Sequence, residues 1–120
     1  MDIDSEVLKN RTRQFALNII KLVEDFPKTK VGDIIGRQLI RSATSIGANY
    51  RSACRAQSHA HFISKISIVE EEADEALYWL ELALATGLVE AKRLSDLINE
   101  ANELTAILTS SRYTAKKRKQ

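Results

Sequence analysis

The sequence has few of the residues that disulfide-rich, all-β and membrane-spanning proteins depend on. It contains one Cys, one Pro and four Gly among 120 residues. A single Cys forms no internal disulfide, which favours a reducing, cytoplasmic location. So few Gly and Pro supply too few turns for a sandwich or barrel of short strands. No apolar run approaches the roughly 18 residues of a membrane span, and the N-terminus, MDIDSEVLKN, is too acidic and polar for a signal peptide.

Motifs for catalysis, metal binding and base-specific recognition are also missing. His59 and His61 are two residues apart, so on a helix they point to different faces and do not hold one metal ion. Neither follows a Glu by three residues, as the ligands of a di-metal carboxylate bundle do. The sequence has no dinucleotide-binding, P-loop, zinc-finger or RNP pattern. We therefore expect no enzymatic activity, no metal and no cofactor.

The residues that are abundant favour helices. Ala, Leu, Ile, Glu, Lys and Arg dominate, and apolar positions recur at helical spacing in four segments. These segments are Ser5–Asp25, with Ser5 as its cap; Val31 or Asp33 to Arg55; His59–Thr86, capped by Ser58 and ended by Gly87; and Glu90–Ser111. Short connections predict antiparallel neighbours. The expected fold is all-α, an up-down four-helix bundle over residues 1–112, followed by a disordered basic tail over residues 113–120.

The second predicted helix has two distinct faces. At 100° per residue, Arg37, Arg41, Arg51 and Arg55 fall within about 40° of one line. The opposite side is apolar and is predicted to face the core; it carries Leu39, Ala43, Ile46, Tyr50 and Cys54. We call the four arginines the arginine stripe. Gly47, in the middle of this helix, predicts a close approach by another helix.

Charge is divided unevenly along the chain. Residues 28–57 carry net charge +5, residues 58–111 carry −7, and residues 112–120 carry +5, including Lys116, Lys117, Arg118 and Lys119. The stripe and the tail together predict an anionic partner, RNA or DNA, bound through phosphates and not base edges. A competing interpretation is that the stripe pairs with Glu71, Glu75 or other acids of the third helix across a subunit contact.

The third predicted helix is apolar on two sides. Its inward side is predicted to carry Phe62, Ile63, Ile66, Val69, Ala73, Leu77, Leu80 and Leu84. Ile68, Trp79 and Leu82 lie roughly opposite, and a helix with two apolar sides is usually buried on both. These three residues predict an oligomer interface, although a loop or the tail covering Trp79 would also explain them. Glu70 lies on the inward side and is expected to accept a hydrogen bond from a hydroxyl or an Arg.

Three blocks of the sequence resemble a known family. They are FALNIIKLVEDFP, GRQLIRSATSIGANYRSACRA and FISKISIVEEEADEALYWLELALATGL, which together cover Phe15 to Leu88. They resemble bacterial four-helix bundle proteins, some of which are encoded by intervening sequences in 23S rRNA genes. The accessory variability determinant of diversity-generating retroelements is related to them. This chain has Ser52 where the family pattern often has Glu, which leaves Arg51 and Arg55 less neutralised.

The resemblance implies a homopentameric ring with no known enzyme activity. In the retroelement accessory protein, a basic surface of the ring binds nucleic acid and partners a reverse transcriptase. By analogy, Arg37, Arg41, Arg51 and Arg55 are candidate nucleic-acid contacts here. The leading hypothesis is an oligomeric bundle that binds RNA or DNA. The alternative is a structural or adaptor module, for a reverse transcriptase or a ribosomal particle, without direct nucleic-acid binding.

Overall fold

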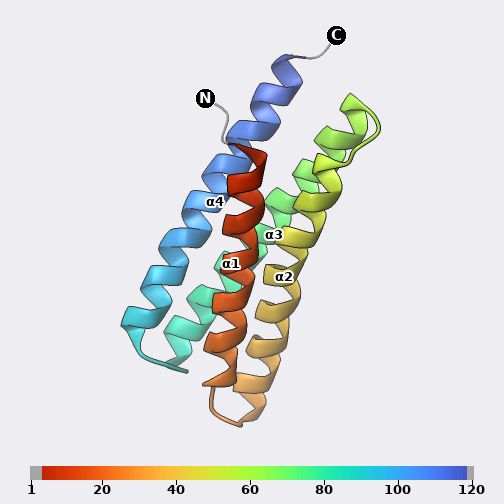
Figure 1. The fold of residues 1–120 in the computed structure, drawn as a ribbon. Coiled ribbons are helices and arrows are strands. Elements are labelled where there is room, and N and C mark those ends of the chain that lie inside the picture. Colours follow the sequence, from red (N-terminus) through yellow and green to blue (C-terminus); the bar gives the residue numbers. More distant parts are fainter. Residues whose placement is uncertain (1–3, 119–120) are drawn as a thin grey trace.

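The chain folds as an antiparallel bundle. The computed structural model describes residues 4–118, and within them lie four helices: α1 (Ser5–Glu24), α2 (Lys30–Cys54), α3 (His59–Thr86) and α4 (Ala91–Lys117). Successive helices run in opposite directions (Figure 1). α2 packs against α1 and α3, α3 also packs against α4, and the contact between α1 and α4 is the lightest. The predicted all-α four-helix bundle is confirmed for the described part of the chain.

The ends of the helices follow the expected capping chemistry. The Ser58 hydroxyl accepts a hydrogen bond from the backbone of α3, and Gly87 ends that helix with a left-handed φ of 69°. Both assignments agree with the prediction. At the start of α1 the predicted cap was wrong by one residue. Asp4 caps the helix, and Ser5 is already helical.

The last helix is longer than predicted. α4 continues to Lys117, so the expected disordered tail was wrong for residues 113–117, and Lys119 lies outside the described residues. Two contacts account for the extension. Ala115 is buried, and the ammonium of Lys117 lies 5.1 Å from the ring centroid of Tyr113. The buried Ala115 and the cation–π pair, whose members are four residues apart, stabilise the last turns of α4. The polar composition of these residues had predicted that they would not pack.

The core is a single apolar cluster drawn from all four helices. The predicted inner face of α2 is buried as expected, with Cys54 half-buried at its end. One predicted core residue is wrong, because Leu84 is 41% exposed. It lies in the last turn of α3, where its chain neighbour Ala83 takes the buried position.

Gly47 lies in contact with α1, as predicted, but the glycine of α2 with least space for a side chain facing α1 is Gly36. A Cβ added to Gly47 would lie 3.5 Å from its nearest neighbour, the Thr12 hydroxyl of α1, which is an ordinary contact. A Cβ added to Gly36 would lie 2.7 Å from a methyl of Val23. Gly47 therefore faces α1 with space for one methyl group, whereas at Gly36 the absence of a side chain lets Val23 of α1 pack against α2.

Candidate nucleic-acid interface

Four arginines hold helices of the bundle to one another. Each bonds to carboxylates of another helix or its cap; the pairs are Arg11 with Glu100 and Glu103, Arg41 with Glu72 and Glu75, Arg93 with Asp25, and Arg112 with Glu70. Two of them, Arg11 and Arg93, join α1 or its cap to α4. Arg11 donates to Glu100 at 3.0 and 2.6 Å and to Glu103 at 2.9 Å. These four guanidinium groups therefore already have carboxylate partners within the chain.

One of these four belongs to the arginine stripe. Arg41 donates to Glu75, and its other terminal nitrogen lies 3.6 Å from Glu72. The Trp79 indole also donates to Glu75, at 3.2 Å. Hydrogen bonds from Arg41 and Trp79 hold the pKa of Glu75 below its ordinary value. The competing interpretation, pairing of the stripe with acids of α3, thus holds for Arg41, although the pairing occurs within one chain.

Glu70 has the partners that its position in the sequence predicted. The Arg112 guanidinium donates to one of its oxygens at 2.6 Å, and the Thr109 hydroxyl donates to the other at 2.5 Å. Hydrogen bonding to Arg112, and then to Thr109, lowers the pKa of Glu70 against the opposing effect of burial. The prediction of a hydroxyl or an Arg is confirmed with both. The cluster ties α3 to α4 and needs no catalytic interpretation.

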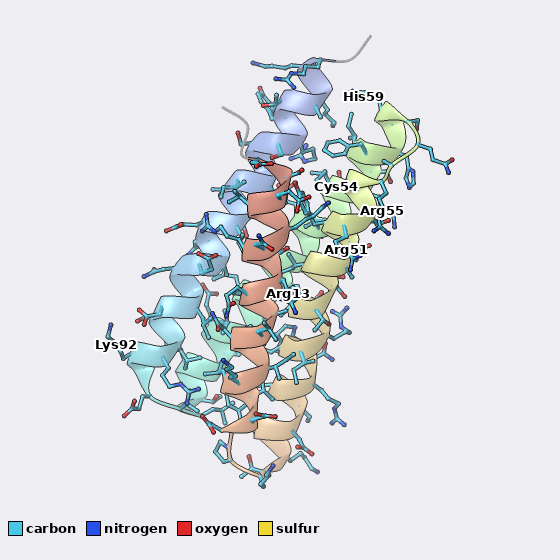
Figure 2. The ribbon with its side chains drawn as sticks, in the orientation of Figure 1. Arg13, Arg51, Cys54, Arg55, His59 and Lys92 are labelled. Carbon is cyan, nitrogen blue, oxygen red and sulfur yellow. The ribbon has the colours of Figure 1, made fainter. Side chains whose placement is uncertain are left out.

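A basic cavity lies between α1 and α2. It has a volume of about 420 Å³, and we call it the α1/α2 cavity. Its lining residues are Glu6, Lys9, Asn10, Arg13 and Ala16 of α1 with Thr44, Gly47, Ala48 and Arg51 of α2. Three cations thus face one carboxylate, Glu6, which already pairs with Lys9 at 3.2 Å. Figure 2 shows Arg13 on α1 beside the stretch of α2 that carries Arg51 and Arg55.

The remaining stripe arginines are exposed, and they lie at different ends of α2. Within residues 4–118, the guanidinium groups of Arg37, Arg51 and Arg55 make no hydrogen bond or ion pair, and neither does that of Arg13. Arg37 lines a separate cavity near the α1–α2 turn, where Asp33 is also present. The structure therefore groups Arg13, Arg51 and Arg55 and places Arg37 about 21 Å along the helix from Arg51.

The end of α4 lies beside the same end of α2. Arg118, which caps α4, lines one cavity together with Cys54 and Ala56, the two residues that flank Arg55. Lys116 and Lys117 are exposed in the last turn of α4. The structure thus brings the basic end of α4 and the C-terminal half of the stripe to one end of the bundle, as Figure 1 allows the reader to follow. Sequence reasoning had joined them only by their charge.

Arg13 and Lys9 are site residues that sequence reasoning missed. They are one helical turn apart on α1, so their side chains lie on the same face. Arg13 is exposed, although apolar positions of α1 on either side of it are buried. The spacing of the two basic residues can be seen in the sequence. The helix that they face depends on the orientation of α1 about its own axis in the bundle, which the sequence does not give.

The predicted oligomer residues lie along the seam between α2 and α3. Ile68, Trp79 and Leu82 are half-buried, and the latter two pack against the core cluster. Trp79 also meets the Tyr78 ring edge-on, with centroids 5.2 Å apart. These side chains are less exposed than a free outer face would be, because they lie beside the packed contact between α2 and α3. Their role in assembly stays a prediction.

The described residues add two further facts. None of the helices within residues 4–118 is long and apolar enough to cross a bilayer. The same residues contain no group of three or more His, Cys, Asp or Glu placed to hold a metal ion.

The four helices also match known proteins. Residues 4–110 match the model of the 23S rRNA-intervening sequence protein family. The chain belongs to this family. A solved structure from Bacteroides thetaiotaomicron, a protein of unknown function from the S23 ribosomal protein family, is 34% identical, with a TM-score of 0.85. The alignment covers 92% of this chain and 99% of that one. No curated protein matches. The predicted family is confirmed.

Proposed function

We propose that this family member is a non-enzymatic helical bundle that binds RNA or DNA through backbone phosphates. The observation that carries the proposal is the division of its arginines. Arg11, Arg41, Arg93 and Arg112 bond to carboxylates between helices, whereas Arg13 and Arg51 line one cavity without a carboxylate partner among residues 4–118. Exposed guanidinium groups placed together in this way suit phosphate oxygens, which they bind with paired N–H donors.

The shape of the α1/α2 cavity favours a phosphate backbone as its occupant. Its lining contains Ala16, Gly47 and Ala48, whose small size allows a chain of phosphates to approach the helices. Thr44 and Asn10 add neutral hydrogen-bonding groups between the cations. The cavity has no row of side chains positioned to read base edges, so binding is expected to be largely independent of sequence.

The basic end of α4 extends this surface. Lys116 and Lys117 lie at the end of the bundle where Arg55 caps α2. They add positive charge beyond the α1/α2 cavity and so extend the basic surface that a polyanion can contact. The family name refers to intervening sequences of 23S rRNA, which makes RNA the first ligand to test.

We further propose that the chain assembles as a closed ring of five copies. The number five rests on the family resemblance, and the seam between α2 and α3 supplies an independent reason for self-association. The apolar side chains of Ile68, Trp79 and Leu82 lie along it and are only partly covered by the chain itself. A ring would present several α1/α2 cavities to one nucleic acid, which raises the apparent affinity.

Fluorescence anisotropy across a salt series tests the proposed function. Labelled single-stranded RNA and duplex DNA are titrated with the protein at salt concentrations from about 50 to about 300 mM. Affinity for phosphates falls steeply over this range. We expect measurable binding at about 100 mM salt and a linear log–log decline, with a slope of about −0.9 per phosphate neutralised on the duplex and about −0.7 on single strands. Absence of binding to either ligand at about 50 mM salt would favour the adaptor alternative.

A further inference from the structure

A second cavity lies at the basic end of the bundle. α4 and the turn between α2 and α3 extend past the first turn of α1 there, as Figure 1 shows. The cavity has a volume of about 370 Å³, and we call it the end cavity. Its lining includes four hydroxyl groups, one thiol, two aromatic rings and one guanidinium group, which belong to Ser5, Tyr50, Ser111, Thr114, Cys54, Phe62 and Arg118.

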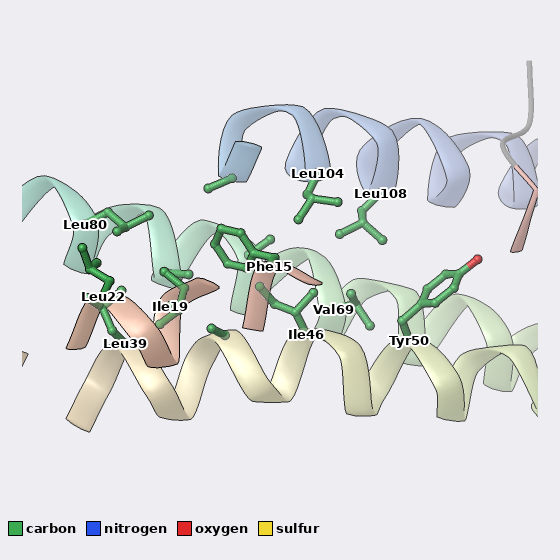
Figure 3. Packing of buried hydrophobic residues seen from close by; sticks show 14 of the residues in the cluster. Phe15, Ile19, Leu22, Leu39, Ile46, Tyr50, Val69, Leu80, Leu104 and Leu108 are labelled. Carbon is green, nitrogen blue, oxygen red and sulfur yellow. The ribbon is translucent and has the colours of Figure 1, made fainter. Parts of the chain in front are cut away.

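The lining of the end cavity combines flat apolar surface with small polar groups. Phe62 is half-buried, so its ring is accessible from the cavity. Tyr50 is only 6% exposed, and Figure 3 shows it at the end of the row of core side chains with its hydroxyl directed toward α4. Burial, and then the neighbouring Cys54 thiol, raise the pKa of Tyr50, so the phenol stays neutral and both donates and accepts hydrogen bonds.

This combination fits a nucleobase better than a lipid. A base has an apolar face that stacks on aromatic rings, and an edge that needs hydroxyl-like donors and acceptors. Ser5, Ser111 and Thr114 supply such groups, and Arg118, which also lines the cavity, offers a planar guanidinium that suits a base. An acyl chain would leave these hydroxyls without partners in an apolar environment, which is unfavourable.

The end cavity lies close to the α1/α2 cavity along the chain, although the two share no lining residue. Glu6 and Arg51 line the α1/α2 cavity, and their chain neighbours Ser5 and Tyr50 line the end cavity. Arg55 lies one helical turn beyond Arg51, about 6 Å along the axis. A strand whose phosphates follow Arg13, Arg51 and Arg55 therefore runs toward the end of the bundle that holds the end cavity.

We propose that the end cavity receives one unstacked base of a single-stranded nucleic acid whose phosphates occupy the α1/α2 cavity. The inference rests on the proposed function and adds a preference to it. A base inside a duplex is stacked and paired, so it does not enter such a cavity without a cost of a few kcal/mol. The chain should therefore bind single strands more tightly than duplexes, although a duplex carries the denser charge.

Filling the end cavity tests this inference. Thr114→Leu places a larger apolar side chain into it, and Ser110→Leu is the matched control, on an exposed position of α4 outside the lining. We expect the wild type to bind a single-stranded 12-mer at least about tenfold more tightly than the duplex of the same sequence, as one base–aromatic stack allows. Thr114→Leu should remove most of that preference and leave duplex binding unchanged, and Ser110→Leu should change neither.

Chemical protection of the wild-type protein gives a second readout that needs no substitution. Cys54 is the single cysteine of the chain and lines the end cavity. Saturating single strand should slow its alkylation by iodoacetamide several-fold, whereas saturating duplex should not. Equal affinity for single strand and duplex, together with unprotected Cys54, would overturn the base-binding inference and leave phosphate binding intact. No binding of either ligand would instead overturn the proposed function.

Discussion

Arg41 of α2 binds Glu75 of α3 within the same chain, and that pair separates it from the rest of the arginine stripe. The third partner is Trp79, whose indole donates to the same carboxylate oxygen. The four arginines share one helix face in the sequence, but their surroundings differ once the helices pack. Arg41 forms an ion pair with Glu75 of α3, whereas Arg51 lines the α1/α2 cavity together with Arg13 of α1.

Arg41→Gln should therefore have a structural effect and little effect on ligand binding. The Arg41 side chain is 49% exposed, so losing its pair with Glu75 should cost less than about 1 kcal/mol of unfolding free energy. Nucleic-acid affinity should fall only slightly, because the charge that is removed lies away from the α1/α2 cavity and is screened by salt. Urea unfolding and anisotropy on the same preparation measure both quantities. A loss of affinity as large as that of Arg51→Gln would show that Arg41 also contacts the ligand.

Two glycines of α2 should respond to Ala in opposite directions. At Gly47 the added methyl meets Thr12 at ordinary contact distance, so Gly47→Ala should gain about 0.5–1 kcal/mol from helix propensity. At Gly36 the methyl would lie 2.7 Å from a branched Val23 side chain, so Gly36→Ala should lose about 1–3 kcal/mol. Denaturant unfolding measures both. The packing account is wrong if the order of the two variants is reversed.

Glu70 should make part of the stability dependent on pH. Its pKa is lowered in the folded state, so its contribution is present above the unfolded value of about 4.3 and is lost as the pH falls through the folded value. Glu70→Gln should therefore lose about 1–2 kcal/mol at pH 7 and much less near pH 3. Unfolding curves at both pH values test this, with the exposed neighbour Glu71→Gln as the control. An equal loss at both pH values would contradict the charged pairing.

The sequence predicted the chemistry of single helices better than the contacts between them. Glu70 could be assigned an Arg or hydroxyl partner from its inward position, but Arg112 and Thr109 could not be named. They lie 42 and 39 residues away, and their proximity depends on the register of α4 against α3. Arg13 was missed for the same reason, because its role depends on how α1 rotates against α2. The end of α4 was missed because one buried position, Ala115, outweighs its polar neighbours.

Substituting Trp79 tests the proposed assembly. Trp79→Glu places a second carboxylate beside Glu75 at the seam between α2 and α3, so an assembly that buries this seam should dissociate. Light scattering should find a wild-type oligomer, with five copies expected from the resemblance, and a smaller species for the variant. Asn99→Glu, on an exposed position of α4, is the matched control and should leave the mass unchanged. A monomeric wild type at micromolar concentration would contradict the ring.

The most direct test of the central claim compares two triple variants that remove the same charge. One replaces Arg13, Arg51 and Arg55 with Gln, and the other replaces Lys28, Lys30 and Arg37, which are exposed near the other end of α2. The measurement is single-stranded RNA affinity as a function of salt, with assembly checked by light scattering. The account predicts that the first variant nearly loses binding at about 100 mM salt and that its log–log slope falls by about 2, as three lost phosphate contacts require, while the second stays near wild type. Equal losses in the two variants would contradict a defined phosphate site between α1 and α2.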